Sequence, residues 1–286
     1  MSIPGRAGGI AGEPMTGLDG DSGLASYRRG DVVSYYANAH GLQPVEAYVF
    51  KTYIAGSARI LDLGVGGGRT TPHLCARASK YVGVDYSPEM VDVCRRRFPE
   101  IEFKCHDAAD LSGYDDASFD AVVFSFNGIG HLWPDLTRHK CLAEVARVLV
   151  PGGRFIFSLH NARGLLIRPS RRDKSVKATL QAIAAATIAS SQRVVKRLSS
   201  ATFWKGRGYL RHLAHGDERI HLATPSVVRT ELAQFGLALV ESAGEAYPRH
   251  LPLVASRWIY YVAEKRGSGQ AGGALANIER GLPGDG

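Results

Sequence analysis

Apolar residues along the chain fall into short runs separated by stretches with helical periodicity. The runs 58–63 and 119–126 are almost continuously apolar, as expected of strands buried on both faces. Further strand-like runs lie at 81–84, 101–105, 154–159, 237–241 and 258–263. Helix-like segments lie at 70–79, 88–98, 136–149 and 226–235. This alternation predicts βαβ units, and therefore an α/β fold with a parallel sheet and right-handed crossovers.

The alternation stops at Arg163 and resumes near Pro225, which predicts an insertion after the fifth strand. We expect five segments in the chain. They are a flexible glycine-rich leader (1–25), the cofactor-binding part of the core with an N-terminal helical segment (26–162), a basic cap insertion (163–223), the end of the core (224–265) and a flexible tail (266–286).

The first strand runs into the sequence Asp62-Leu63-Gly64-Val65-Gly66-Gly67-Gly68-Arg69 and then into a helix. Glycines permit positive φ and let a ligand lie against the backbone, while the helix N-terminus offers unpaired N–H groups. A dinucleotide fold has glycine or alanine at the sixth position of this turn, where Arg69 stands here. A carboxylate at Asp62 would oppose a pyrophosphate but suits a cationic amino group. The alternative is a tight turn that binds no ligand.

Two more carboxylates follow the next strands. Asp85 ends the second strand, where doubly wound folds place an acid that accepts hydrogen bonds from ribose hydroxyls. Asp107 follows the third strand and could accept a hydrogen bond from an adenine amino group. An ordinary helix-capping role for Asp85 and an ordinary loop role for Asp107 stay open.

These motifs, in this order, resemble the class I S-adenosylmethionine-dependent methyltransferases, in particular their small-molecule branch. The resemblance covers about 59–161 and again 224–265. It is carried by the glycine-rich turn, by Val84-Asp85-Tyr86-Ser87, by Asp107-Ala108, by the strand at 119–122 and by the Arg147-Val148-Leu149-Val150-Pro151-Gly152-Gly153 turn.

The resemblance implies a mostly parallel sheet of seven strands in the order 3-2-1-4-5-7-6, with the last strand antiparallel. Helices would cover both faces, and a helical cap would be inserted after strand five. It also implies S-adenosylmethionine as the cofactor, bound over the ends of the first two strands. The implied cofactor-binding residues are Asp62, Gly64, Gly66, Gly68, Asp85, Tyr86, Asp107, Ala108 and Ser125.

Methyl transfer to a hydroxyl benefits from a general base near the carboxyl ends of strands four and five. His131 is the first candidate and His160 the second, against the alternative that both are structural. The candidate acceptor-binding residues are Tyr35, Tyr36, Asn127 and Asn161, with core packing as the alternative for the tyrosines. The H-x-x-H pair of His212 and His215 could suggest a metal, but Arg211 and Arg219 flank it. The resemblance implies a metal-independent enzyme, because metal-dependent members of the family carry an aspartate pair and an Asn around strand four.

Composition changes this picture in one respect. The 286 residues carry a formal net charge of +8, but residues 163–211 alone hold twelve Lys or Arg and one Asp. The rest of the chain is therefore mildly acidic. An amphipathic helix is expected over 175–199, either as a lid with a solvated basic face, as part of a site for an anionic acceptor, or as a surface for membrane or nucleic acid. Few aromatic residues lie there, which makes nucleic acid the weakest of these partners.

The four cysteines form no metal-binding or disulfide pattern, and no apolar stretch is long enough to span a membrane. We therefore expect a cytoplasmic protein. The leading hypothesis is a methyltransferase acting on a hydroxyl of a small molecule such as a sugar, a quinone or a natural-product intermediate. The alternatives are a methyltransferase acting on an anionic lipid or nucleic acid through the basic cap, and an NAD(P)-dependent oxidoreductase, which Asp62 and Arg69 disfavour.

Overall fold

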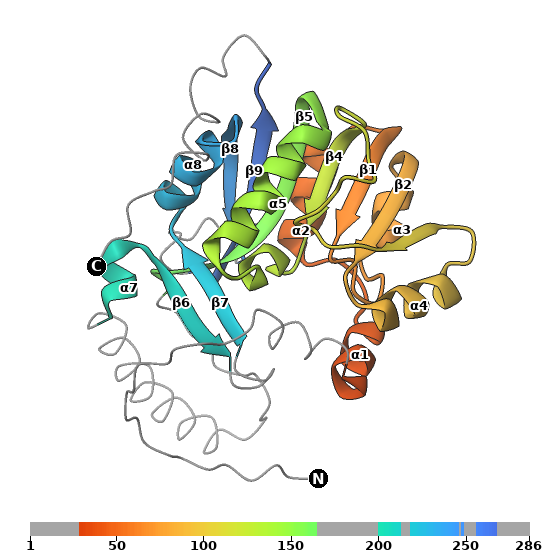
Figure 1. The fold of residues 1–286 in the computed structure, drawn as a ribbon, viewed down its shortest axis with the longest axis horizontal. Helices are drawn as coiled ribbons and strands as arrows, with labels where there is room; N and C mark the ends of the chain where they lie inside the picture. Colours follow the sequence, from red (N-terminus) through yellow and green to blue (C-terminus); the bar gives the residue numbers. More distant parts are fainter. Residues whose placement is uncertain (1–28, 165–199, 213–217, 246, 249–255, 268–286) are drawn as a thin grey trace.

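A computed structural model describes residues 29–164, 200–212, 218–245, 247–248 and 256–267. A single twisted sheet runs through this part of the chain, with helices on both of its faces (Figure 1). The strands are β1 (Ala58–Leu63), β2 (Ala78–Asp85), β3 (Glu102–Cys105), β4 (Phe119–Phe124), β5 (Leu149–Asn161), β6 (Arg207–His212), β7 (Glu218–Ala223), β8 (Leu237–Gly244) and β9 (Trp258–Lys265).

The first five strands are parallel and lie in the order β3-β2-β1-β4-β5, as predicted. Beyond β5 the sheet divides. The middle of β5 pairs with β9 in an antiparallel ladder, and β9 pairs with β8. The last two residues of β5 pair with β7, which forms an antiparallel hairpin with β6.

The predicted count of seven strands and the predicted order beyond strand five are therefore wrong. The two additional strands, β6 and β7, lie within 163–223, where the sequence predicted a helical cap. The consecutive residues Ile220, His221, Leu222 and Ala223 of β7 are all buried, so this strand is covered on both faces and lacks the alternating burial of a strand with one solvated face. The predicted helix at 175–199 lies outside the described residues.

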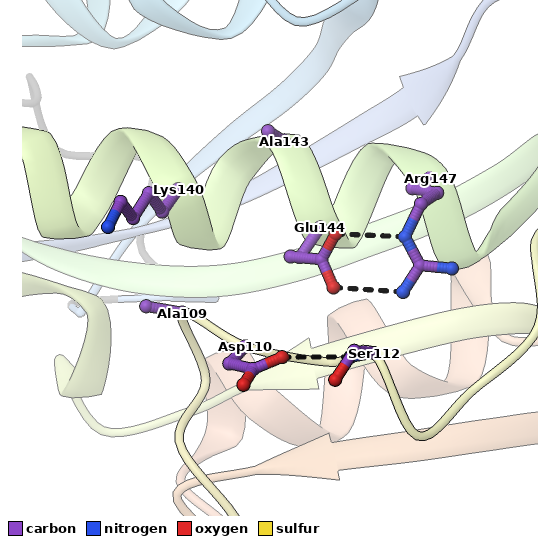
Figure 2. Close-up of a pocket in the computed structure, with 7 residues that line it drawn as sticks. All are labelled: Ala109, Asp110, Ser112, Lys140, Ala143, Glu144 and Arg147. Carbon is purple, nitrogen blue, oxygen red and sulfur yellow. Dashed lines mark hydrogen bonds and ion pairs between the residues drawn. The ribbon is translucent and has the colours of Figure 1, made fainter.

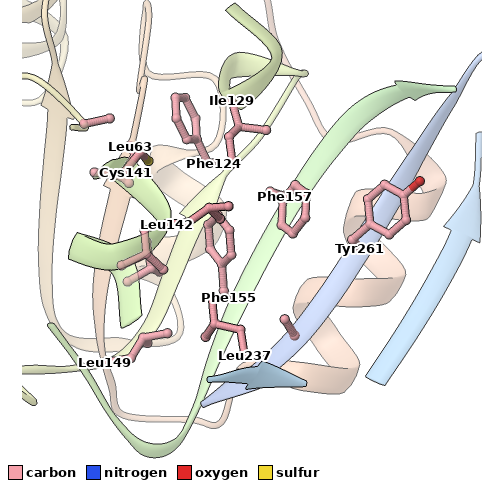
Figure 3. Packing of buried hydrophobic residues seen from close by; sticks show 14 of the residues in the cluster. Leu63, Phe124, Ile129, Cys141, Leu142, Leu149, Phe155, Phe157, Leu237 and Tyr261 are labelled. Carbon is pink, nitrogen blue, oxygen red and sulfur yellow. The ribbon is translucent and has the colours of Figure 1, made fainter. Parts of the chain in front are cut away.

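The helices cover the sheet in two layers. One face carries α5 (Asp135–Val148) and α8 (Pro225–Ala233), whose apolar side chains join those of the central strands in one cluster (Figure 3). The other face carries α2 (Pro44–Tyr53), α3 (Thr71–Cys75) and α4 (Pro88–Arg97) over a second cluster. The remaining helical segments are α1 (Gly30–Ala37), the 3₁₀ turn η2 (Gly128–His131) and the short α7 (Ala201–Lys205).

Candidate functional site

The carboxyl ends of β1, β2, β4 and β5 meet at one edge of the sheet. Parallel doubly wound sheets bind their ligands along this edge, because the strand order reverses there and a crevice opens between the loops. The glycine-rich turn follows β1, Asp85 ends β2, Ser125–Asn127 follows β4, and His160 lies at the end of β5. The candidate residues from the sequence are thus distributed along a common edge, as their order predicts.

The glycine-rich turn keeps its backbone close to neighbouring groups. Gly64 and Gly66 have backbone φ angles of 59° and 55°, a region that residues other than glycine rarely adopt. A Cβ on Gly64 would lie 2.6 Å from the Phe124 ring, whereas a Cβ on Gly66 would meet nothing nearer than Tyr36 at 3.8 Å. Gly64 is therefore required for packing on β4, and space remains above Gly66.

Asp85 connects the end of β2 to this turn. Its Oδ2 accepts a hydrogen bond from the Gly66 backbone N–H (2.8 Å), and its Oδ1 accepts one from the Ser87 N–H (3.0 Å). Burial raises the pKa of Asp85, and these backbone donors oppose that shift. Ser87 in turn caps α4, because its hydroxyl accepts a hydrogen bond from the Met90 N–H. The carboxylate of Asp85 therefore shapes the turn while keeping lone pairs for a hydroxyl ligand.

Asp62 lies at the base of the turn and is buried. Its Oδ2 accepts hydrogen bonds from the hydroxyls of Thr70 (2.7 Å) and Tyr81 (2.9 Å). Burial raises its pKa to about 6, although both hydroxyls lower it. Asp62 thus joins the two ends of the glycine-rich turn to β2, and its contact with a cationic amino group stays a prediction.

A buried ionic cluster, which the sequence did not reveal, lies beside the turn. Glu46 of α2 has no exposed surface, and its carboxylate accepts two hydrogen bonds of 2.6 Å from the Arg69 guanidinium. It also accepts from the hydroxyls of Ser125 (2.6 Å) and Tyr260 (2.5 Å) and from the Gln43 N–H (2.8 Å). These donors hold the pKa of Glu46 below its ordinary value against the opposing effect of burial.

One signal in the sequence could have identified this cluster. The buried positions of α2 are Val45, Glu46, Val49 and Phe50, so the glutamate stands within the apolar stripe of the helix. A charged residue in such a stripe requires a partner of opposite charge. The partner is Arg69, and the sequence shows it as the residue that replaces glycine at the sixth position of the turn. Only the fold shows that the two meet.

The segment after β4 adopts an unusual backbone. Phe126 and Asn127 have φ of 57° and 66°, and left-handed conformations at two successive residues that are not glycine are uncommon. The Phe126 ring packs edge-on against Tyr36 and lies under the Arg69 guanidinium, 5.1 Å from ring centroid to Cζ. Ser125, which we expected at the cofactor, donates its hydrogen bond to Glu46 in this structure.

The other predicted residues take varied positions. Asp107 accepts from the Ala109 N–H (2.8 Å) and thereby forms a turn, Ala108 is buried, and Tyr86 is half-buried after β2. His131 and His160 are half-buried at the ends of η2 and β5.

Asn161 and the two tyrosines of α1 complete the predicted set. The Asn161 side chain donates to the Ser256 carbonyl (3.0 Å) and accepts from the Arg163 N–H (3.0 Å), so it holds two backbone segments together. Tyr36 lies above the glycine-rich turn, whereas Tyr35 is 62% exposed.

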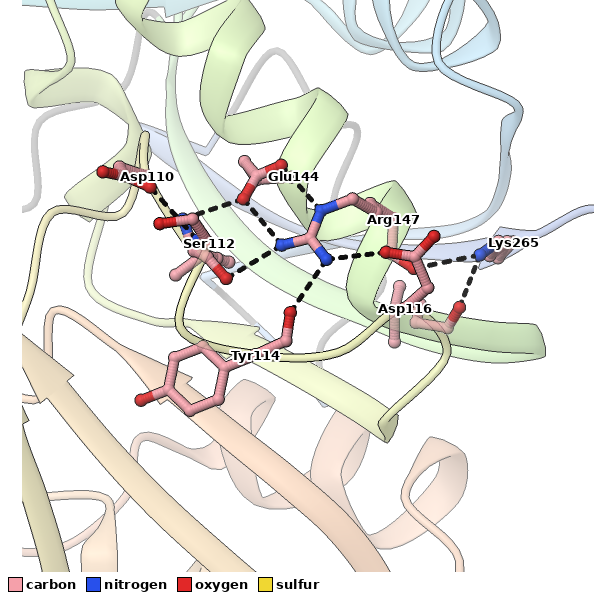
Figure 4. A network of polar contacts seen from close by, with 9 residues as sticks. Asp110, Ser112, Tyr114, Asp116, Glu144, Arg147 and Lys265 are labelled. Carbon is pink, nitrogen blue, oxygen red and sulfur yellow. Dashed lines mark hydrogen bonds and ion pairs between the residues drawn. The ribbon is translucent and has the colours of Figure 1, made fainter.

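A pocket on the α5 face lies away from these residues (Figure 2). It is lined by Ala109, Asp110, Ser112, Lys140, Ala143, Glu144 and Arg147. Arg147 holds the loop after β3 through Glu144, Asp116 and the carbonyls of Leu111 and Tyr114 (Figure 4). This network stabilises the loop that carries Asp107. The polar groups of the network form hydrogen bonds with one another.

The arrangement defines a class of protein. A doubly wound α/β sheet with a glycine-rich turn after β1 and an acid at the end of β2 is a nucleotide-binding fold. Residues 60–153 match the family model described as "Methyltransferase domain". The match includes the glycine-rich turn, Asp85 and Asp107, so this part of the chain is similar to a methyltransferase domain.

Two curated relatives are similar to different extents of the chain. A demethylmenaquinone methyltransferase of Clavibacter sepedonicus is 42% identical over 106 residues, which are 36% of this chain and 41% of the relative. A fatty-acid O-methyltransferase of Mycolicibacterium smegmatis is 29% identical over 205 residues, which are 70% of this chain and 67% of the relative. The chain spans less than half the length of this demethylmenaquinone methyltransferase and of an uncharacterized methyltransferase of Mycobacterium bovis that it also matches.

A solved structure is similar over most of the chain. It is the 1,6-didemethyltoxoflavin-N1-methyltransferase of Burkholderia thailandensis, with its acceptor and S-adenosylhomocysteine bound. The TM-score is 0.56 at 18% identity, and the match covers 90% of this chain and 94% of the other. A likeness at this identity supports the fold.

Two features are absent from the residues that the structure describes. Within these residues, no group of three or more His, Cys, Asp and Glu side chains could hold a metal ion. No helix among them is long and apolar enough to cross a membrane.

Proposed function

We propose that this protein transfers the methyl group of S-adenosylmethionine to a hydroxyl of a small molecule, without a metal ion. One observation carries the proposal. The carboxylate of Asp85 accepts a hydrogen bond from the Gly66 N–H of the glycine-rich turn, and the domain match spans both of these residues. A second carboxylate, Asp62, lies at the base of the same turn.

The residues of this edge fit the chemical groups of the cofactor. The ribose hydroxyls are donors, and Asp85 offers acceptor lone pairs beside an open glycine backbone. The cofactor's amino group is a cation, and Asp62 is a buried carboxylate at the base of the turn. We assign Asp107 and Ala108 to the adenine, Tyr86 to the ribose, and Gly64, Gly66, Gly68 and Ser125 to the remaining cofactor contacts. NAD(P) is disfavoured because Arg69 stands where a pyrophosphate-binding turn has a small residue.

The cofactor supplies an electrophilic methyl group on a sulfonium. The protein then has to orient the acceptor in line with that methyl group and accept the hydroxyl proton. His131 and His160 are the proposed bases, since both lie at the ends of elements that reach the carboxyl edge. Tyr36 and Asn127 are proposed to contact the acceptor, with Tyr35 and Asn161 at the periphery.

Oxygen as the atom that receives the methyl group is supported by the names of relatives. They include the fatty-acid O-methyltransferase and a ubiquinone biosynthesis O-methyltransferase of Xanthomonas oryzae pv. oryzae, which is 32% identical over 43% of this chain and 52% of the relative. The acceptor of the structural neighbour is also a small molecule. We therefore propose a compact acceptor that carries a hydroxyl group.

The experiment that tests the proposal measures binding of S-adenosylhomocysteine by calorimetry. We expect binding to the wild-type protein, and we expect Asp85→Ala to weaken it at least ~10-fold, because the variant loses both the hydroxyl acceptor and the hold on Gly66. Asp120→Ala is the matched control, because Asp120 pairs with Arg59 at the opposite edge of the sheet. Absence of binding to the wild type, or equal binding by the Asp85 variant, would contradict the proposal.

The acceptor is sought with isotope-labelled S-adenosylmethionine and a panel of phenols, sugars and fatty acids. Mass spectrometry then detects a product that carries the labelled methyl group. His131→Asn and His160→Asn are expected to lower the rate of product formation ~10²- to 10⁴-fold for the residue that acts as base, while binding of S-adenosylhomocysteine is retained. If both variants keep the wild-type rate, neither histidine is the base.

A further inference from the structure

Arg69 has hydrogen-bond donors that the protein does not use. An arginine side chain carries five N–H groups. Nη1 of Arg69 donates to the Gly41 carbonyl (2.9 Å) and to Glu46 (2.6 Å), and Nη2 donates to Glu46 (2.6 Å). The Nε–H and the second Nη2–H remain, and no residue in the described ranges accepts a hydrogen bond from them.

The two remaining N–H groups point in the same direction. They occupy the Nε/Nη2 edge of the planar guanidinium, which is one of the two edges that can bind a carboxylate with two parallel hydrogen bonds. Glu46 occupies the other edge. The Arg69 side chain is 13% exposed, so its unused edge is not sealed within the core.

A purely structural arginine of the same domain provides a contrast. All five N–H groups of Arg147 have acceptors, two on Glu144, one on Asp116 and two on backbone carbonyls (Figure 4). A half-buried arginine that only joins structural elements can therefore be fully satisfied in this fold. Arg69 is only partly satisfied, and it lies beside the proposed cofactor site.

The surroundings hold the Arg69 guanidinium in place. Glu46 orients it from α2, and the Phe126 ring supports one of its faces. The charge of Glu46 is shared with the hydroxyls of Ser125 and Tyr260 as well as with Arg69, so Arg69 does not neutralise it alone. A guanidinium that is fixed before the ligand arrives loses little side-chain entropy on binding.

We propose that the Nε/Nη2 edge of Arg69 binds a carboxylate group of a ligand. The proposal rests on the proposed function, and two sources of the carboxylate are possible there. One is the methionine portion of the cofactor, because the guanidinium lies between the glycine-rich turn and the end of β4. The other is an acceptor that itself carries a carboxylate. Glu46 is a positioning residue in this proposal, since it acts through Arg69.

The first arm of the test compares S-adenosylmethionine with its decarboxylated form, which lacks only the carboxylate. If the cofactor supplies the carboxylate, the wild-type protein binds the decarboxylated form ~10- to 100-fold more weakly. The double variant Glu46→Gln/Arg69→Met, which removes both charges of the pair, binds the two compounds equally. Arg59→Gln is the matched control, because Arg59 makes a similar two-point pair with Asp120 at the opposite edge, and it keeps the wild-type preference.

A third variant covers the case in which the double variant does not fold. Arg69→Lys keeps a positive charge for Glu46 but lacks the second edge, so it is expected to keep the fold, measured by circular dichroism, and to lose most of the preference for S-adenosylmethionine. If Arg69→Lys keeps the whole preference, the cofactor carboxylate does not bind at this edge.

The second arm titrates benzoate and decanoate into the protein, both alone and saturated with S-adenosylhomocysteine. Binding that is lost in Glu46→Gln/Arg69→Met and kept in Arg59→Gln assigns the edge to an acceptor carboxylate. If neither arm depends on Arg69, the proposal is overturned. If the wild-type protein binds no S-adenosyl compound, the proposed function fails, and Arg69-dependent binding of benzoate or decanoate then decides this proposal alone.

Discussion

At the scale of single residues, the proposed site combines ionised groups with deep burial. Asp62, Asp85 and Glu46 are all buried at the carboxyl edge, and each accepts hydrogen bonds from protein donors. Glu46 has a cationic partner, whereas Asp62 has two neutral hydroxyls. An unpaired buried carboxylate lowers stability, so its retention at Asp62 fits a role in binding a cation.

The substitution Asp62→Asn tests this conflict between stability and binding. The folded-state pKa of Asp62 is raised to about 6 from 3.8, so the fold penalises the ionised form at pH 7. We expect Asn to raise the free energy of unfolding at pH 7 by about 1–3 kcal/mol, because its amide oxygen still accepts from Thr70 and Tyr81. The gain declines as the pH falls from 6 towards 4, since Asp62 is then protonated in the fold.

Urea unfolding between pH 4 and pH 8 measures this effect. Asp120→Asn is the control with the opposite sign, because Arg59 lowers the pKa of Asp120 and its ionised form is favoured by the fold. S-adenosylmethionine should bind Asp62→Asn more weakly than the wild type. A variant that is less stable at pH 7 would show that the Asp62 charge is compensated in the fold.

At the scale of elements, the β6–β7 hairpin is joined to α5 and α8 through buried polar groups. Arg138 of α5 donates two hydrogen bonds to Glu231 of α8 (2.8 and 3.0 Å). It also forms an ion pair with Asp135, whose carboxylate accepts a hydrogen bond from the hydroxyl of Tyr209 in β6. His221 of β7 packs against Tyr209 and is only 2% exposed. Neither of its ring nitrogens has a hydrogen-bond partner among the described residues.

The substitution His221→Phe should make the stability of the protein less dependent on pH. Burial and the nearby Arg138 lower the pKa of His221 to about 4. The unfolded chain binds a proton near pH 6.5, so this histidine contributes stability above pH 6.5 that is lost as the pH falls towards 4. This loss amounts to about 2–3 kcal/mol of unfolding free energy, and the His221→Phe variant should not show it. The substitution also removes a buried donor that has no partner in the described part of the chain.

Thermal or urea unfolding at pH 7.5 and pH 4.5 gives the difference between the two proteins. His73→Asn serves as the control, because His73 is exposed on α3. Equal pH dependence of the wild type and His221→Phe would show that His221 has a partner when the protein is in solution.

The hairpin also shows why the element prediction was incomplete. The strands β1 to β5 are apolar runs bounded by turns, and their alternation with helices predicted a parallel sheet, whereas their order in the sheet was implied only by the family resemblance. In the hairpin, Tyr209 and His221 are covered by charged groups of α5 and α8, which only the tertiary fold brings near. Glu46 and Arg69 escaped prediction for the same reason, since their contact spans 23 residues of sequence and two layers of the fold.

At the scale of the whole molecule, the proposed site depends on segments from both ends of the described chain. Glu46 lies in the second helix and Tyr260 in the last strand, 214 residues apart, and their side chains meet beside the loop after β4. A ligand that contacts this edge therefore interacts with elements from both halves of the sheet. Binding should stabilise these elements together, because a ligand that binds only the folded state shifts the unfolding equilibrium of the whole domain.

S-adenosylhomocysteine at 100 times its Kd should raise the free energy of unfolding by about 2.7 kcal/mol. For a protein of this size, that corresponds to a rise in Tm of roughly 5–10 °C. Glu241→Gln separates this ligand effect from general stability. Glu241 lies in β8, in the middle of the β8–β9 ladder, and its carboxylate accepts hydrogen bonds from the hydroxyls of Tyr48 and Tyr53 in α2. The variant weakens these bonds and should therefore lower the Tm of the ligand-free protein. The ligand-induced rise in Tm should remain in this variant, because no proposed cofactor contact is changed.

If the rise in Tm disappears in Glu241→Gln, the ligand acts through the packing of α2 on β8. If it disappears only in Asp85→Ala, the effect lies at the glycine-rich turn.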